Sequence, residues 1–176
     1  MIPSVPWACA ATLIPWRAAS STIARISGYG QDGPYRDKPA FGAIGEAIGG
    51  LRHLTGHPAG TTELPPPRCG ISISDDLAGM YAAIGLLSAL WQRDAGPDGQ
   101  GTGRGRIIDV NLVDSVFSLM EGMLPEYAMD GRVRQPVGAA IETAAPTNTY
   151  PCADGRWLCI AGNSDLIFAR LMAAIG

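Results

Sequence analysis

Apolar side chains recur every three or four residues over "SDDLAGMYAAIGLLSALWQRD" (74–94), a period that predicts an α-helix. Its large apolar residues form one face that we expect to be buried: Leu77, Met80, Tyr81, Ile84, Leu87 and Trp91. A second stripe consists of small residues: Ala78, Ala82, Gly85 and Ala89. Because small residues let another backbone approach closely, we expect this helix to be buried on two sides.

Shorter patterns predict the other elements of the chain. They are strands at 22–27 and 106–112, a helix at 41–51 ended by Gly49-Gly50, a helix at 112–131 interrupted near Pro125, a hairpin at 147–162, and a helix that begins at Ser164 or Asp165. Residues 1–23 are assigned to no domain. The mixture of strands and helices predicts an α/β protein, and no internal repeat is found.

The composition of the 176 residues predicts a folded chain, because 47% of them are apolar and 16% are charged. A net charge of -3 without a run of Lys or Arg argues against nucleic-acid binding. No apolar run approaches the ~20 residues that span a bilayer, so no membrane partner is expected. Four cysteines without a C-x-x-C pair indicate reduced thiols and a cytoplasmic protein: Cys9, Cys69, Cys152 and Cys159.

Three glycines, Gly28, Gly30 and Gly33, form the G-x-G-x-x-G pattern of a dinucleotide-binding loop. Such a loop needs a helix directly after it and an acidic residue about 20 positions further on. Here Pro34 follows the pattern, and the position of the acid holds His53. We therefore interpret the glycines as a turn with positive φ rather than as an NAD site.

No metal site is predicted from the histidines. His53 and His57 are four residues apart with Cys69 further along, but Pro58 follows at once and the segment does not look helical. A zinc site needs three or four ligands in a fixed geometry, so we interpret both residues as loop histidines.

Asp75 lies where a loop enters the long helix, and two interpretations are open. It is an N-cap carboxylate, a role for which Ser74 and Asp76 compete, or it is a nucleophile. The positive end of the helix dipole keeps such a carboxylate ionised, and an ionised carboxylate can attack an acyl carbon. In the second interpretation the glycine-rich stretches 28–33 and 49–50 supply N–H donors to the oxyanion.

Three stretches of the chain resemble the class III CoA-transferases (CaiB/BaiF type) in order and spacing: residues 26–56, 65–90 and 101–119. This family comprises formyl-CoA, carnitine and dicarboxylate CoA-transferases, and α-methylacyl-CoA racemases are its relatives. The resemblance covers about residues 24–176. It implies part of a Rossmann-like large domain over 24–125, then a linker and the beginning of a smaller α+β domain over 126–176.

The resemblance implies that Asp75, four residues before Gly79, is the nucleophile. In this family the carboxylate attacks the acyl-CoA thioester to give a mixed anhydride. The CoA thiolate then attacks the anhydride and leaves an aspartyl-CoA thioester, and a short carboxylic or dicarboxylic acid reverses both steps. CoA is a co-substrate, and no permanently bound cofactor is expected.

Residues near CoA are implied as well, namely Lys38, Gly28, Gly30, Gly49 and Gly50. Arg52 and Arg68 are candidates for binding an acceptor carboxylate, with surface ion pairing as the alternative.

The chain also departs from the family. Racemase relatives carry a histidine and an acid where this chain has Phe41 and Gly42, which argues against racemase activity. Segment 136–146 has only Gly138 where some members have a glycine-rich lid. Members are considerably longer and form homodimers, so we expect a fragment, with an inactive remnant as the alternative to an active transferase.

Overall fold

The computed structural model describes residues 20–176, so most of the unassigned N-terminal segment and Cys9 lie outside the described residues. The elements, in chain order, are β1 (Ile23–Ser27), α1 (Gly42–Ile48), α2 (Leu51–Leu54), α3 (Ile73–Asp94), β2 (Ile107–Asn111), α4 (Leu112–Phe117), the 3-10 turn η2 (Ser118–Met120), α5 (Met123–Asp130), β3 (Thr147–Pro151), β4 (Trp157–Ala161) and α6 (Asp165–Ile175). The expected α/β class is confirmed.

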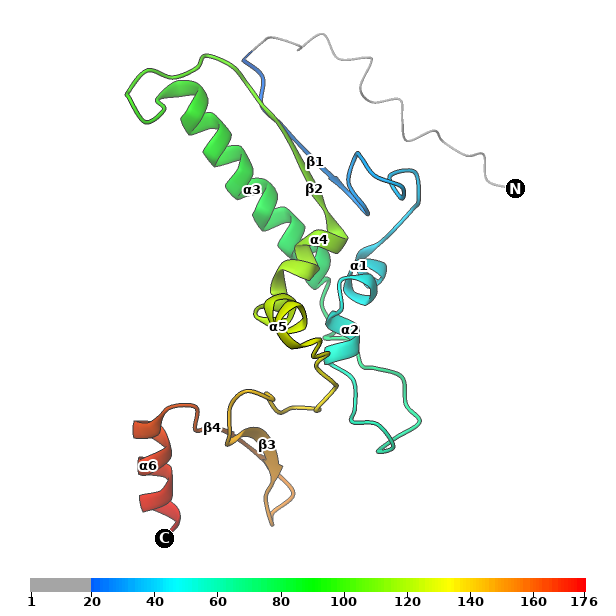
Figure 1. Cartoon of the computed structure of the whole chain (residues 1–176), viewed down its shortest axis with the longest axis vertical. Coiled ribbons are helices and arrows are strands. Elements are labelled where there is room, and N and C mark those ends of the chain that lie inside the picture. The colour runs from blue at the N-terminus through cyan, green and yellow to red at the C-terminus, as the bar shows by residue number, and fades with distance from the viewer. Residues whose placement is uncertain (1–19) are drawn as a thin grey trace, which may run out of the picture.

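A β-α-β unit organises the first part of the fold. Strands β1 and β2 are parallel, in a register that pairs Ile23 with Ile107 and Ser27 with Asn111. The connection between them contains α1, α2 and α3, and α3 runs along both strands (Figure 1). Both strands and the long helix were predicted from the sequence and are confirmed.

The small face of α3 packs against the sheet. A compact core joins Ala78 and Ala82 of the helix to Val110 and Leu112. Further along, a Cβ added to Gly85 would lie only 2.8 Å from Cγ2 of Ile108. The prediction that these small side chains allow a close approach is therefore confirmed.

The large apolar face of α3 is not buried among the described residues, which corrects our expectation. Of the six side chains, Leu77 alone is buried there, and the other five are exposed by 40% to 68%: Met80, Tyr81, Ile84, Leu87 and Trp91. The periodicity identified an apolar face correctly, but no described segment covers it.

By length and composition alone, α3 is also apolar enough to count as a candidate membrane span within residues 20–176. That result corrects the statement that no apolar run has the required length; the absence of a membrane partner stays a prediction.

Two glycines of α3 give a matched test of this packing. Nothing lies within 4 Å of a Cβ at Gly79, whereas Gly85 meets Ile108. Gly79→Ala is expected to stabilise the protein by about 0.5–1 kcal/mol, because alanine is the better helix former. Gly85→Ala gains the same propensity but is expected to destabilise by about 1–3 kcal/mol through overpacking. Urea unfolding midpoints measure both, and equal shifts in the two variants would contradict the close packing.

The second helical region breaks earlier than predicted. The interruption lies at Glu121, whose φ is +48°, and Gly122 precedes the new helix. Pro125 sits in the first turn of α5, where the missing N–H of proline costs no helical hydrogen bond. The proline therefore does not break the helix.

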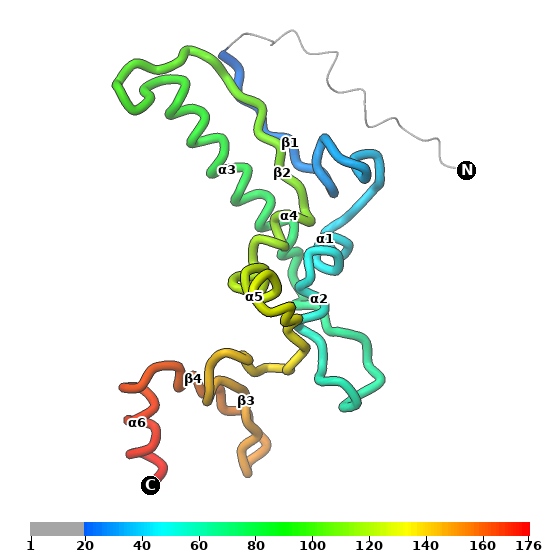
Figure 2. The backbone as a smooth tube through the Cα atoms, in the orientation of Figure 1, coloured from blue at the N-terminus to red at the C-terminus, as the bar shows by residue number. Residues whose placement is uncertain are grey.

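The C-terminal elements follow the sequence prediction. Strands β3 and β4 form an antiparallel hairpin that pairs Thr147 with Ala161. Helix α6 is capped by Ser164, whose Oγ accepts a hydrogen bond from the Ile167 amide. Figures 1 and 2 show the hairpin and α6 apart from α3 and the β1–β2 sheet, connected through the segment after α5. The domain boundary at 125/126 stays a prediction.

Candidate active site

Asp75 is the third residue of α3, and its carboxylate has no hydrogen-bond or ion-pair partner among residues 20–176. The N-cap is Ser72, which makes no side-chain cap bond, so neither Asp75 nor its two competitors is the cap. The N-cap interpretation is therefore wrong. Asp75 is thus an exposed carboxylate in the first turn of a 22-residue helix, near the positive end of the helix dipole and open to a substrate.

This turn lies at the carboxyl edge of the parallel strands. Ser74 is buried and its Oγ donates a 3.1 Å hydrogen bond to the carbonyl of Leu112, which directly follows β2. At the same edge the Val113 amide donates to the carbonyl of Gly28, just after β1. Open α/β sheets bind their ligands at the carboxyl ends of their strands, so Asp75 occupies the expected position for a site.

Gly42 makes room for the Asp75 carboxylate. It is the buried first residue of α1, and a Cβ there would overlap Oδ2 of Asp75. The same Cβ would lie 3.7 Å from Nη2 of Arg68. The start of α1, the start of α3 and the loop that carries Arg68 thus meet around the carboxylate.

Behind this meeting point lies a buried acid, Glu46, which is 0% exposed. The Nε and Nη2 groups of Arg68 donate to its Oε1 at 3.2 and 3.0 Å. The Nη1 atom of Arg52 lies 3.6 Å from Oε2 without a hydrogen bond to it. Sequence reasoning missed Glu46; the signal available was a single acid within the otherwise uncharged, glycine-rich stretch 41–50.

The glycine pattern near β1 is a turn, as interpreted, with φ of +88° at Gly30 and +83° at Gly33. The Gly30 amide donates to Oγ of Ser27 at 3.0 Å. The loop is held against the middle of β2 by Asp109, whose Oδ2 accepts a hydrogen bond from the Gln31 amide at 2.7 Å.

Three of the proposed oxyanion donors are already engaged, which corrects that part of the prediction. Besides Gly30, the amides of Gly49 and Gly50 donate to carbonyls of α1 at 2.8 and 3.3 Å. An amide that already donates a hydrogen bond within the protein is not free to donate to an oxyanion.

Lys38 is exposed, with Nζ 3.8 Å from the centre of the Tyr35 ring. Contact of CoA with Lys38 and with the four glycines stays a prediction.

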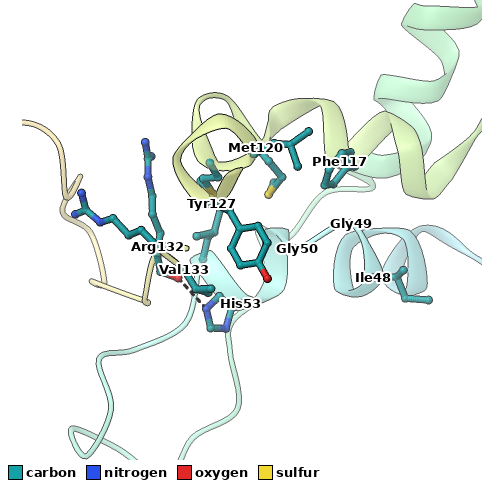
Figure 3. Close-up of a pocket in the computed structure, with 13 residues that line it drawn as sticks. Ile48, Gly49, Gly50, His53, Phe117, Met120, Tyr127, Arg132 and Val133 are labelled. Atoms are coloured by element: carbon teal, nitrogen blue, oxygen red, sulfur yellow. Dashed lines mark hydrogen bonds between the residues drawn. The ribbon is translucent and has the colours of Figure 1, made fainter. Parts of the chain in front are cut away.

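Gly49 and Gly50 instead border a separate apolar hollow of about 280 Å³ between α1, α2 and α5 (Figure 3). Tyr127 of α5 points toward Gly50 and His53 there, and Asp75 is not among the lining residues. His53 belongs to α2 rather than to a loop, and its Nε2 lies 3.2 Å from the carbonyl oxygen of Arg134.

The wall of this hollow carries an ion pair between Arg134 and Glu126. The guanidinium donates to both carboxylate oxygens, with Nε 2.8 Å from Oε2. These hydrogen bonds lower the pKa of Glu126 below its ordinary value and raise that of Arg134. Both charges are therefore satisfied within the fold.

The described residues include no group of three or more side chains placed to hold a metal ion. Cys69, Cys152 and Cys159 are free thiols.

Comparison with known proteins gives a consistent picture. A family model described as CoA-transferase family III matches residues 22–176. The chain is 49% identical over 152 residues to the succinyl-CoA–D-citramalate CoA-transferase of Chloroflexus aurantiacus, covering 86% of this chain and 35% of that protein. It is 40% identical over 153 residues to the beta subunit of the succinyl-CoA–L-malate CoA-transferase of the same organism, covering 86% and 36%.

Among solved structures, a CaiB/BaiF family protein from Brucella suis superposes with a TM-score of 0.70 at 28% identity, covering 90% of this chain and 39% of that one. The chain thus spans about a third of the length of the curated relatives it matches. The resemblance drawn from its three motifs is confirmed, and the chain belongs to CoA-transferase family III.

Proposed function

We propose that this chain takes part in CoA transfer between a dicarboxylic acyl-CoA and a second short dicarboxylic acid, by covalent catalysis at Asp75. The observation that supports this most directly is the Asp75 carboxylate, which has no partner among residues 20–176 and lies at the carboxyl edge of the sheet, in the space left by Gly42. Both relatives named above transfer CoA from succinyl-CoA to another dicarboxylic acid, which supports the substrate class.

The proposed first half-reaction has two steps. A carboxylate oxygen of Asp75 attacks the thioester carbon; the C–S bond breaks, and a mixed anhydride and CoA thiolate form. The thiolate then attacks the Asp75 carbonyl carbon, which releases the donor acid and leaves an aspartyl-CoA thioester. CoA is consumed and returned as a co-substrate.

The second half-reaction reverses these steps with the acceptor. The acceptor carboxylate attacks the aspartyl thioester to form a new anhydride and free thiolate. The thiolate attacks the acceptor carbonyl, which yields the acceptor's CoA ester and restores the Asp75 carboxylate. Asp75 needs access to substrate on its open side throughout, and its exposure fits that need.

Two alternatives carry different weight. An acyl-CoA racemase needs proton acceptors, and neither Phe41 nor Gly42 can take a proton. An inactive remnant is favoured by one observation, the exposed large apolar face of α3.

We also propose a cytoplasmic, homodimeric protein with no permanently bound cofactor, in line with the family expectation.

The test is a covalent trap. The purified chain, first shown to unfold cooperatively, is incubated with succinyl-CoA and its intact mass is measured before and after hydroxylamine. We expect a hydroxylamine-sensitive adduct, and peptide mapping should find the resulting hydroxamate on Asp75. A cooperatively folded chain without an adduct would support the remnant, and an adduct on Cys69 would contradict the assigned nucleophile.

A further inference from the structure

We infer that Arg68 is the specificity residue for the distal carboxylate of the substrate, held in place by the buried carboxylate of Glu46. The inference rests on the proposed function, because it concerns the acid that reacts at Asp75. Arg68 approaches Asp75 across the space above Gly42, close enough that one methyl group at Gly42 would contact both side chains. No ion pair joins Arg68 and Asp75, so each of the two charges is left to interact with a substrate that covers both groups.

The guanidinium of Arg68 has donors left to bind a ligand. Arginine carries five N–H groups, and here Glu46 accepts one from Nε and one from Nη2. Both N–H groups of Nη1 and one of Nη2 remain, and the side chain is 41% exposed. A planar guanidinium with a free edge binds a carboxylate through two parallel hydrogen bonds.

The surrounding charges favour an anion at this edge. Glu46 is a single buried carboxylate next to two partly exposed arginines, so these three side chains together carry one positive charge, which faces the Asp75 carboxylate. Glu46 is completely buried, and its two bonds to Arg68 fix the plane of the guanidinium instead of leaving it free to rotate. Glu46 is therefore a positioning residue, and Arg68 makes the contact.

The spacing suits a four-carbon diacid. In a reacting complex the thioester carbon lies about 3–3.5 Å from the Asp75 oxygen. Three C–C bonds of about 1.5 Å each separate it from the distal carboxylate carbon, a span of about 4 Å. Because Arg68 lies close to Asp75, a succinyl chain that bends back over the carboxylate would bring its distal carboxylate to the free edge of Arg68, whereas the methyl end of butyryl-CoA offers it no partner.

The first experiment compares two donors that differ only in the distal carboxylate, succinyl-CoA and butyryl-CoA. Rates of adduct formation are measured by intact mass for the wild type, Arg68→Gln, Arg68→Lys and Glu46→Gln. Arg156→Gln is the control, because Arg156 is an exposed arginine of the β3–β4 turn. We expect Arg68→Gln to lower the preference for succinyl-CoA about 10- to 100-fold, with butyryl-CoA little affected.

The variants separate the roles. Arg68→Lys keeps the positive charge but cannot donate two parallel hydrogen bonds, so it should retain only part of the preference for succinyl-CoA over butyryl-CoA. Glu46→Gln should lower the preference less than Arg68→Gln does. An equal loss with both donors would overturn the inference, because it would assign Arg68 to the CoA phosphates, and unchanged rates in Arg68→Gln would overturn it as well.

A binding measurement separates this inference from the proposed function. The ¹⁵N-labelled chain is titrated with succinate and with butyrate at equal ionic strength, in the wild type and in Arg68→Gln. Succinate binding that depends on Arg68 without any adduct would sustain the inference and contradict covalent catalysis by this chain. Equal binding of the two acids, or succinate binding that survives in Arg68→Gln, would overturn the inference whatever the adduct experiment gives.

Discussion

Replacing Asp75 by asparagine is expected to abolish adduct formation with succinyl-CoA, by about 10³-fold or more, because the amide is not a nucleophile. Asparagine has almost the same shape, and the carboxylate it replaces makes no hydrogen bond or ion pair with residues 20–176. The lost interaction with the helix dipole amounts to less than about 1 kcal/mol. The free energy of unfolding should therefore change little while reactivity disappears.

Asp76 provides the matched control for this experiment. It is an exposed carboxylate in the same first turn of α3, one position further on. Asp76→Asn removes the same charge from the same helix end and should leave the rate within a few-fold of the wild type. If both variants lose reactivity equally, the carboxylates act through the electrostatic field of the turn rather than through attack by Asp75. If Asp75→Asn still forms the adduct, Asp75 is not the nucleophile.

The elements of this fold could be predicted because their signals are local. The period of α3, the β-branched strands and the Ser164 cap each depend on a few neighbouring residues. The burial of the large α3 face was predicted wrongly for a related reason. A period shows that Ile84 and Leu87 share a face, but it does not show which segment covers that face.

The position of Asp75 at the start of α3 was predictable from the sequence, but its surroundings were not. Asp75 stood out by its motif, and its role as the nucleophile stays a proposal. Its relation to Gly42 and to Arg68 depends on how α1 packs against the start of α3, which no local pattern contains. Glu46 was missed because a buried acid is recognised only by its partners, and Arg68 lies 22 residues away.

Glu46 was missed, whereas the oxyanion donors were predicted where the structure does not leave them free. Gly49 and Gly50 have the residue type that such a donor loop uses, but their amides bond within the end of α1. Glycine is required at Gly50 for a different reason, since its φ of +95° lies in the left-handed region. The glycine residue type correctly predicted an unusual backbone conformation. It could not predict the hydrogen-bond partners of the two amides, which depend on the fold.

Gly42→Ala is expected to lower the rate of adduct formation about 100-fold while the protein stays folded. The added methyl would overlap Oδ2 of Asp75, the end of a short side chain, so the carboxylate moves rather than the backbone. A displacement of about 1 Å from the attacking position is enough for a loss of this size. Alanine also suits the first position of α1, whose φ there is not in the left-handed region, so stability should stay within about 1 kcal/mol.

Ala43→Ser is the matched control, because it adds one heavy atom at the next, exposed position of α1. It should leave both the rate of adduct formation and the urea midpoint close to those of the wild type. A Gly42→Ala protein that reacts at the wild-type rate would show that the Asp75 carboxylate attacks from another rotamer. The space above Gly42 would then not belong to the site, and the proximity of Arg68 to the nucleophile would lose its significance. If Gly42→Ala loses reactivity and Ala43→Ser does not, the absence of a side chain at position 42 of α1 determines the position of the Asp75 carboxylate.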